Sequence, residues 1–136
     1  MRAFVALTTA CLLMALCGCG LCGNDIVQEV ISPDGQKKAV IFQRDCGATT
    51  AFSTQISVLP RQDSPSGSGN IFVADADHGA VPVGPKGVMD IRVRWESDRK
   101  LVIAHPLQAR VFLKEANWGL VSIRYELQDP PGEARK

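Results

Sequence analysis

The chain lacks an excess of charge of either sign. It has 15 lysines and arginines against 14 aspartates and glutamates in 136 residues. This balance argues against nucleic acid as a partner, because such surfaces neutralise phosphates with clustered basic residues. Aromatic residues make up only 6%, and there are only two histidines, His78 and His105. The usual general base of nucleophilic catalysis is therefore scarce.

The N-terminus carries the longest uncharged stretch. Met1-Arg2 is followed by "AFVALTTACLLMAL" at 3–16, which is short for a membrane-spanning helix. A basic start and an apolar run of this length predict a secretory signal peptide over residues 1–18. The next letters, "LCGC" at 16–19, resemble the bacterial lipobox. The resemblance implies that Cys19 is lipidated and becomes the mature N-terminus; plain secretion or an uncleaved anchor is the alternative.

Lipidation places the protein in the bacterial cell envelope, with the membrane as a partner through the lipid anchor. Several acyl chains anchor a protein stably where one chain is marginal. The residue after Cys19 is Gly20 rather than aspartate. By resemblance to lipoproteins of Gram-negative bacteria, this implies the outer membrane, facing the periplasm.

Three roles are open to Cys46 in "RDCGATT", residues 44–50: nucleophile, metal ligand or half of a disulfide. Of five cysteines, two leave with the signal peptide and Cys19 is lipidated, so Cys22 and Cys46 remain. In an oxidising compartment this pair predicts a disulfide. A nucleophile needs a nearby base, and a phosphatase loop would place arginine where Phe52 stands. A metal site lacks a second cysteine or histidine at close spacing.

The mature chain is rich in short segments that alternate apolar and polar residues, which predict half-buried strands. Such segments occupy 26–31, 38–43, 53–59, 71–74, 88–96, 100–105, 109–115 and 120–128. They predict one all-β domain over 26–128, built from antiparallel hairpins or a meander as a small sandwich or open barrel. A short helix around 108–116 is the alternative to the weakest strand. Residues 19–25 are expected to be the lipidated N-terminus and tether, and 129–136 a flexible tail.

Two loops interrupt the strand pattern. "PRQDSPSGSGN" at 60–70 is rich in proline, serine and glycine and is expected to be mobile. The loop at 75–87 carries Asp75, Asp77 and His78, which are weak candidates for a cation site because oxygen ligands at alternate positions suit calcium. The glycine and distal glutamate of an EF-hand loop are missing. We therefore expect a solvated loop, with no metal and no other cofactor.

Several motifs together resemble one family of short bacterial lipoproteins of unknown function. They are "SPDG" at 32–35, "AVIF" at 39–42, "RDCGATT" at 44–50, "STQ" at 53–55, "GNIFVAD" at 69–75 and "VRWESDRKLVI" at 93–103. The resemblance carries no activity. From the residues, the loop after Cys46 is either a structural connection or a binding rim formed by Arg44, Asp45, Thr49 and Thr50.

The expected function is a lipid-anchored binding module that recognises an envelope protein or a glycan, and not an enzyme. An inhibitor of a cell-wall lytic enzyme is an alternative that rests on analogy of size, anchor and fold. A hydrolase that uses paired carboxylates or a hydroxyl nucleophile is a further one. The sequence shows no Ser-His-Asp set or glutamate pair at a recognisable spacing.

Overall fold

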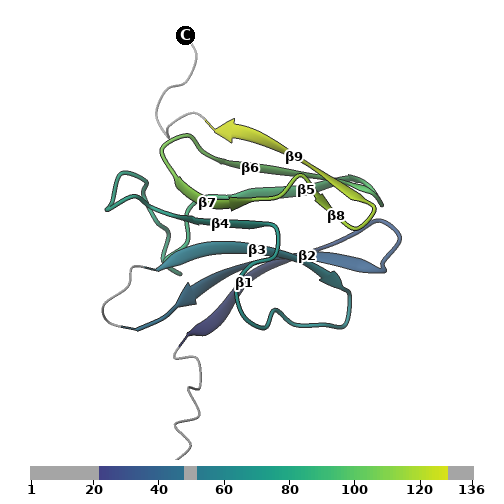
Figure 1. The fold of residues 1–136 in the computed structure, drawn as a ribbon, viewed down its shortest axis with the longest axis horizontal. Coiled ribbons are helices and arrows are strands. Elements are labelled where there is room, and N and C mark those ends of the chain that lie inside the picture. The colour runs from purple at the N-terminus through teal and green to yellow at the C-terminus, as the bar shows by residue number, and fades with distance from the viewer. Residues whose placement is uncertain (1–21, 48–51, 129–136) are drawn as a thin grey trace, which may run out of the picture.

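The computed structural model describes residues 22–47 and 52–128, which form two facing β-sheets (Figure 1). The first sheet has the order β1-β2-β3-β4-β7, with bounds Gly23–Ile31, Lys37–Asp45, Ser53–Pro60, Phe72–Asp75 and Arg110–Lys114. The second has the order β5-β6-β9-β8, with bounds Arg92–Ser97, Lys100–Pro106, Val121–Gln128 and Asn117–Trp118. The described residues contain no helix, so the prediction of a small all-β sandwich is confirmed.

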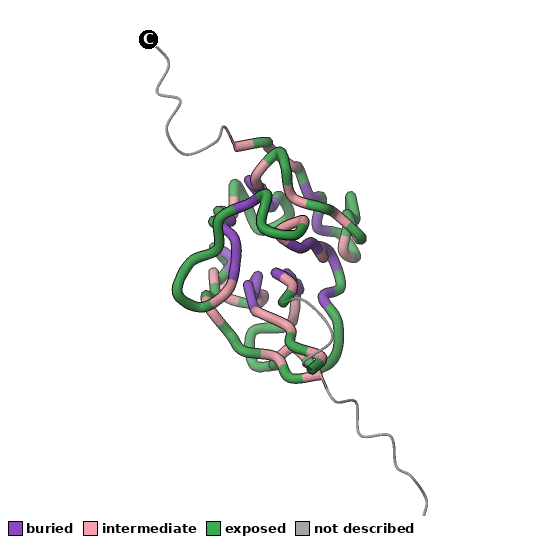
Figure 2. The backbone as a smooth tube through the Cα atoms, turned by 90° about the vertical axis from the view of Figure 1, so that its left-hand side faces the viewer, coloured by how far each residue is buried: buried purple, intermediate pink, exposed green. Residues whose placement is uncertain are grey.

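The core lies between the two sheets, where Figure 2 shows the buried parts of the chain gathered inside exposed loops. Alternate residues of each central strand point inward, as the period of two requires. The fully buried members with large side chains include Ile56, Phe72, Leu101 and Ile103. At the edge of the sandwich, Trp95 on β5 donates its indole N–H to the carbonyl of Val30 on β1 at 2.9 Å. This bond ties the two sheets together.

The C-terminal half confirms the weakest predicted strand and departs from the sequence prediction in two ways. Residues 110–114 form strand β7, as the pattern over 109–115 predicted, and not the alternative helix; Val111 packs against the core while Phe112 is exposed. Strand β5 begins at Arg92 rather than at residue 88, and Val88–Ile91 is a connecting segment. The pairing of β6 with β9 is parallel. Parallel neighbours are joined by a crossover, here residues 107–120, and not by a hairpin.

The pairing register places the connections at two opposite ends of the sandwich. At the first end, which we call the loop end, Gly23 pairs with Asp45, and Asp75 pairs with both Ser53 and Arg110. Strand β1 thus starts at Gly23, within the stretch predicted to be tether. At the opposite end, which we call the turn end, lie the β1–β2 turn and the β5–β6 turn, on the right in Figure 1.

The loop at 60–70 packs over the outer face of the first sheet, contrary to the expectation of mobility. Gly69 N–H donates to Gln55 Oε1 at 2.6 Å, and the Asn70 side chain bonds both backbone groups of Val58 at 2.8 and 2.9 Å. The Asn24 amide donates to the Pro65 carbonyl at 3.2 Å. The composition favoured flexibility, but these bonds to buried strands hold the loop in place.

Candidate functional site

Cys46 is joined to Cys22 by a disulfide with an S–S distance of 2.04 Å, so the predicted pairing is confirmed. The bridge lies at the loop end, where Gly23 and Asp45 pair beside it. A sulfur in a disulfide has no thiolate to attack a substrate or to bind a metal. In this oxidised form, Cys46 therefore cannot act as a nucleophile or as a metal ligand.

The predicted binding rim is only partly described. The Arg44 guanidinium donates to Asn24 Oδ1 at 2.6 Å, and Asn24 in turn bonds the 60–70 loop. Asp45 accepts a bond from the backbone N–H of Gly47 at 2.9 Å. These bonds give Arg44 and Asp45 structural partners at the loop end. Thr49 and Thr50 lie outside the described residues, as does Cys19, and recognition by this run stays a prediction.

The weak cation candidates surround a guanidinium. Asp75 is buried and binds Arg110 through two bonds of 3.1 and 2.5 Å, which lower the pKa of the Asp75 carboxyl. The Nε2 atom of His78 lies 3.5 Å from the same guanidinium, and Asp77 N–H donates to Asp75. Within residues 22–47 and 52–128, no group of three acidic, histidine or cysteine side chains is arranged to hold a metal ion. Arg110 occupies the position that a cation would take.

The second histidine is a core residue. His105 is 3% exposed and packs against Phe72 at a ring distance of 5.2 Å. Burial lowers the pKa of the His105 imidazole. Its Nε2 atom is the one buried side-chain polar atom without a hydrogen-bond partner among the described residues. A neutral imidazole enclosed by the core has no route to a substrate.

A second polar cluster lies at the turn end, and it begins with the "SPDG" turn. Ser32 Oγ donates to Asp34 Oδ1 at 2.6 Å, and the backbone of Gln36 donates to the same oxygen at 3.1 Å. Lys37 Nζ lies 3.0 Å from Asp34 Oδ2. Gly35 takes a φ of 71°, the left-handed conformation expected of glycine there. The turn is thereby fixed with its carboxylate bonded on three sides.

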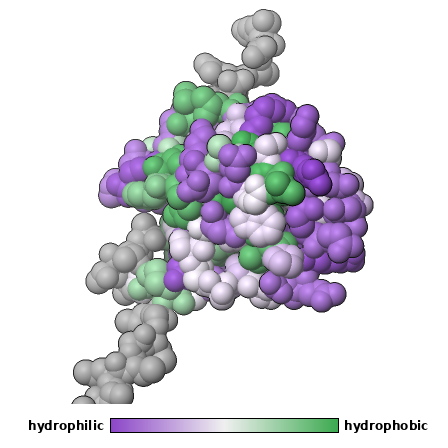
Figure 3. Space-filling model, turned by 45° about the vertical axis from the view of Figure 1, so that its right-hand side comes forward, coloured by the Kyte–Doolittle hydropathy of each residue, from purple (hydrophilic) through white to green (hydrophobic). Residues whose placement is uncertain are grey.

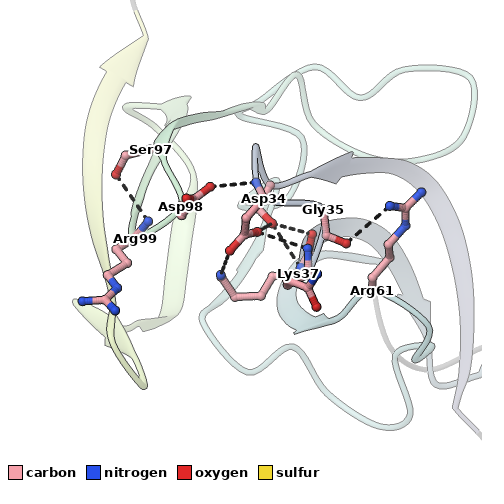
Figure 4. Close-up of polar contacts among 9 residues, drawn as sticks. Asp34, Gly35, Lys37, Arg61, Ser97, Asp98 and Arg99 are labelled. Carbon is pink, nitrogen blue, oxygen red and sulfur yellow. Dashed lines mark hydrogen bonds and ion pairs between the residues drawn. The ribbon is translucent and has the colours of Figure 1, made fainter.

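The β1–β2 turn meets the β5–β6 turn of the other sheet. The backbone N–H of Asp34 donates to Asp98 Oδ1 at 2.7 Å, as Figure 4 shows. Behind this contact, the backbone carbonyl of Arg99 accepts a bond from Ser122 N–H at 2.9 Å, which joins the second turn to β9. Two turns that are 64 residues apart in the sequence are thus held in contact.

A cleft of about 410 Å³ opens beside this junction. Its lining consists of Asp34, Lys37, Asp98, Arg99, Trp118, Leu120 and Val121. Trp118 packs partly against the core, and Leu120, at the tip of the next hairpin, is 78% exposed. Two carboxylates and two cations line the cleft, so their formal charges cancel. A mixed apolar and polar lining of this kind is typical of small-ligand sites.

Two hydrogen-bond donors at the cleft have no acceptor among the described residues. The other indole, Trp95, and the single tyrosine, Tyr125, both bond backbone carbonyls. By contrast, the Trp118 indole N–H and the Arg99 guanidinium donate no hydrogen bond to any described residue. Tryptophan at an interface commonly offers its apolar ring and its N–H together. An aromatic residue and donors without an acceptor among the described residues are therefore part of the cleft lining.

Asp34 is not suited to act as the general acid of a hydrolase at neutral pH. Bonds from Ser32, Gln36 and Lys37 lower the pKa of Asp34 to about 2. A general acid at neutral pH needs a carboxyl whose pKa is raised toward 7. Asp34 is instead held ionised, as an acceptor of hydrogen bonds.

Sequence reasoning missed this site. Asp34 and Asp98 each lie between two predicted strands, at 26–31 and 38–43 and at 88–96 and 100–105, but nothing in the sequence brings them together. Trp118 lies just before the last predicted strand, and Leu120 lies at its first position. No motif marks either residue.

No helix both long and apolar enough to cross a membrane occurs in the part of the chain that the structure describes. Comparison with known protein families, with curated proteins and with solved structures found no match to this chain. The family resemblance drawn from the sequence motifs therefore stays a prediction.

Proposed function

We propose that this protein is a lipid-anchored module of the bacterial envelope that binds a neutral glycan in the cleft at the turn end. The observation that carries the proposal is Trp118, which lines the cleft and whose indole N–H has no acceptor among the described residues. The lipobox-like "LCGC" supports the anchor.

The chemistry of a pyranose fits the lining. A pyranose presents a face of C–H groups and a rim of hydroxyls, which pair with an aromatic ring and with nearby polar groups. Trp118 supplies the ring and a donor, Arg99 supplies further donors, and the free Asp98 oxygen accepts. Because the formal charges of the lining cancel, a neutral sugar leaves the net charge of the cleft at zero, whereas a charged ligand would not.

Binding to purified peptidoglycan sacculi, and to a soluble N-acetylhexosamine tetrasaccharide, tests the proposal. Trp118→Ala should weaken binding ~10-fold or more, as loss of an aromatic anchor usually does. Trp118→Phe keeps an aromatic ring but removes the N–H, so its affinity for the glycans should lie between those of wild type and Trp118→Ala. Arg92→Ala is the matched control, because Arg92 is exposed on β5 and lies outside the cleft.

Thermal melts of each variant separate binding from folding, since Trp118 also packs against the core. A Trp118→Ala protein that binds both glycans as wild type does would end the proposal. Absence of glycan binding together with inhibition of a lytic transglycosylase or amidase would favour the inhibitor alternative. Release of reducing sugar from the tetrasaccharide would favour the hydrolase.

A further inference from the structure

The lipidation motif stands very close to the folded domain. Cys19 precedes Cys22 by three residues, and three residues span at most ~11 Å. Cys22 is fixed to the loop end by its disulfide with Cys46 and by the pairing of Gly23 with Asp45. A lipid on Cys19 therefore keeps the loop end within about that distance of the bilayer surface.

Exposed apolar side chains stand at this same end. Phe52, which directly precedes β3, is 53% exposed. Val83, which is 52% exposed, lies on the connection from β4 to β5, beside a cleft that Val27 and Gln28 of β1 also line. A Cβ atom placed on Gly87 would lie 3.7 Å from Phe52 Cδ2, so the phenyl ring is next to the 82–87 tip. We call Phe52, Pro82, Val83 and Lys86 the loop-end rim. In Figure 1 the connection from β4 to β5 lies at the left, opposite the turns of the cleft.

The 82–87 tip is held rigidly. Val83 bridges to Met89, and Gly84 N–H donates to the Val88 carbonyl at 2.8 Å. The base of the tip is anchored in the core, because Val81 and Met89 are 4% and 2% exposed. Met89 N–H also bonds Thr54 Oγ1 at 3.1 Å. A rigid tip loses little conformational entropy when it binds a surface.

We infer that the loop-end rim rests in the lipid interface, with Phe52 and Val83 entering the boundary between headgroups and acyl chains. Lys86 then lies level with the lipid phosphates, its stem along the apolar side chains and its ammonium in the polar layer. This inference rests on the proposed lipidation of Cys19. The inference also sets the position of the cleft relative to the membrane. Strand β1 runs from the loop end to the turn end, and its nine residues at ~3.3 Å each separate these ends by roughly 30 Å.

Figure 3, which turns the right-hand side of the molecule forward, shows polar residues over much of that face and apolar ones gathered toward the left. In the inferred orientation the cleft opens away from the anchoring membrane, about 30 Å from its surface. A glycan held at that distance is not reached by the lipid headgroups.

Fluorescence quenching in vesicles tests the orientation. The full lipidated protein is reconstituted in phosphatidylglycerol–phosphatidylethanolamine vesicles whose lipids are brominated near the headgroup. Val83→Trp should lose its added emission, because interfacial side chains sit ~5–10 Å into this boundary. Leu120→Trp is the matched control at the turn end and should keep its added emission. Wild type, with Trp95 and Trp118, supplies the background.

Equal quenching of the two variants, or none in Val83→Trp, would overturn the inference. Flotation of wild type and of Cys19→Ser with the vesicles separates this failure from failure of the anchor. Wild type that floats without quenching at Val83 refutes the orientation alone, whereas wild type that does not float refutes the anchor and the orientation with it. Capture of a protein, rather than lipid, by a photocrosslinker at Val83 in intact envelopes would also refute it.

Discussion

Gly69→Ala tests whether the 60–70 loop is part of the fold. An alanine Cβ there would lie 2.7 Å from the Phe72 carbonyl oxygen and 2.9 Å from the Ile56 carbonyl oxygen. Neither carbonyl can retreat without disturbing the pairing of β3 with β4. Overpacking of this kind costs about 1–3 kcal/mol. Displacement of Gly69 N–H from Gln55 Oε1 adds about 1 kcal/mol, for a total of about 2–4 kcal/mol.

For a domain of this size, ~1 kcal/mol corresponds to roughly 4 °C, so the melting temperature should fall by about 8–16 °C. Scanning calorimetry of the oxidised protein measures this. Gly84→Ala is the matched control: its Cβ would meet only the Val88 carbonyl oxygen at 3.7 Å, an ordinary contact. We expect that variant to melt within a few degrees of wild type, since exposed replacements change stability by under ~0.5 kcal/mol. Equal melting of the two variants would refute the packing of the loop.

Reduction of the Cys22–Cys46 disulfide, which links residues 24 positions apart, should lower the free energy of unfolding by about 3.5 kcal/mol on the chain-entropy model. Urea unfolding with and without reductant measures this loss, and unchanged midpoints would contradict the prediction. His105 has a folded pKa below its unfolded value near 6.5, so acidification favours the unfolded state from about pH 6.5 downward. His105→Phe should flatten that part of the stability profile, and an identical slope in both proteins would argue against it. Asp34 and Glu126, both with pKa values of about 2, contribute stability that is present above their unfolded pKa near 4 and lost between about pH 4 and 2; a urea midpoint constant across that window would refute their role.

The charged outer face of the second sheet explains why its sequence read so clearly as strand. Arg94 and Arg124 bind Glu126 at 2.9 and 2.6 Å, and Arg124 also binds Glu96 at 2.5 Å. These four side chains alternate with inward-facing apolar residues on β5 and β9. Val102, between the two strands on β6, is only 1% exposed. The aliphatic stems of long charged side chains can cover such a residue.

The sequence alone determined the features that depend on local pattern or on counting. Alternation of apolar and polar residues predicts strands, because a strand places successive side chains on opposite faces. The count of cysteines predicted the Cys22–Cys46 pair, because the signal peptide and the lipid account for the other three. The strand at 110–114 stayed ambiguous, because the short apolar run 111–113 fits a helix or a strand equally well. Only the hydrogen bonds from β4 decide for the strand.

Tertiary structure decided which of these local features meet. The cleft depends on the stacking of two sheets, which brings Asp34 to Asp98 across 64 residues of sequence and sets Trp118 beside them. Contacts within the first sheet bond a loop of flexible composition to the outer face of β3, and the pairing of β4 with β7 brings Arg110 to the suspected cation site. Local propensity acts over a few residues, whereas these contacts arise when separate strands bury their apolar faces together. No single stretch of the sequence therefore predicts the site, whereas the alternating pattern of each stretch predicts nearly every strand that builds it.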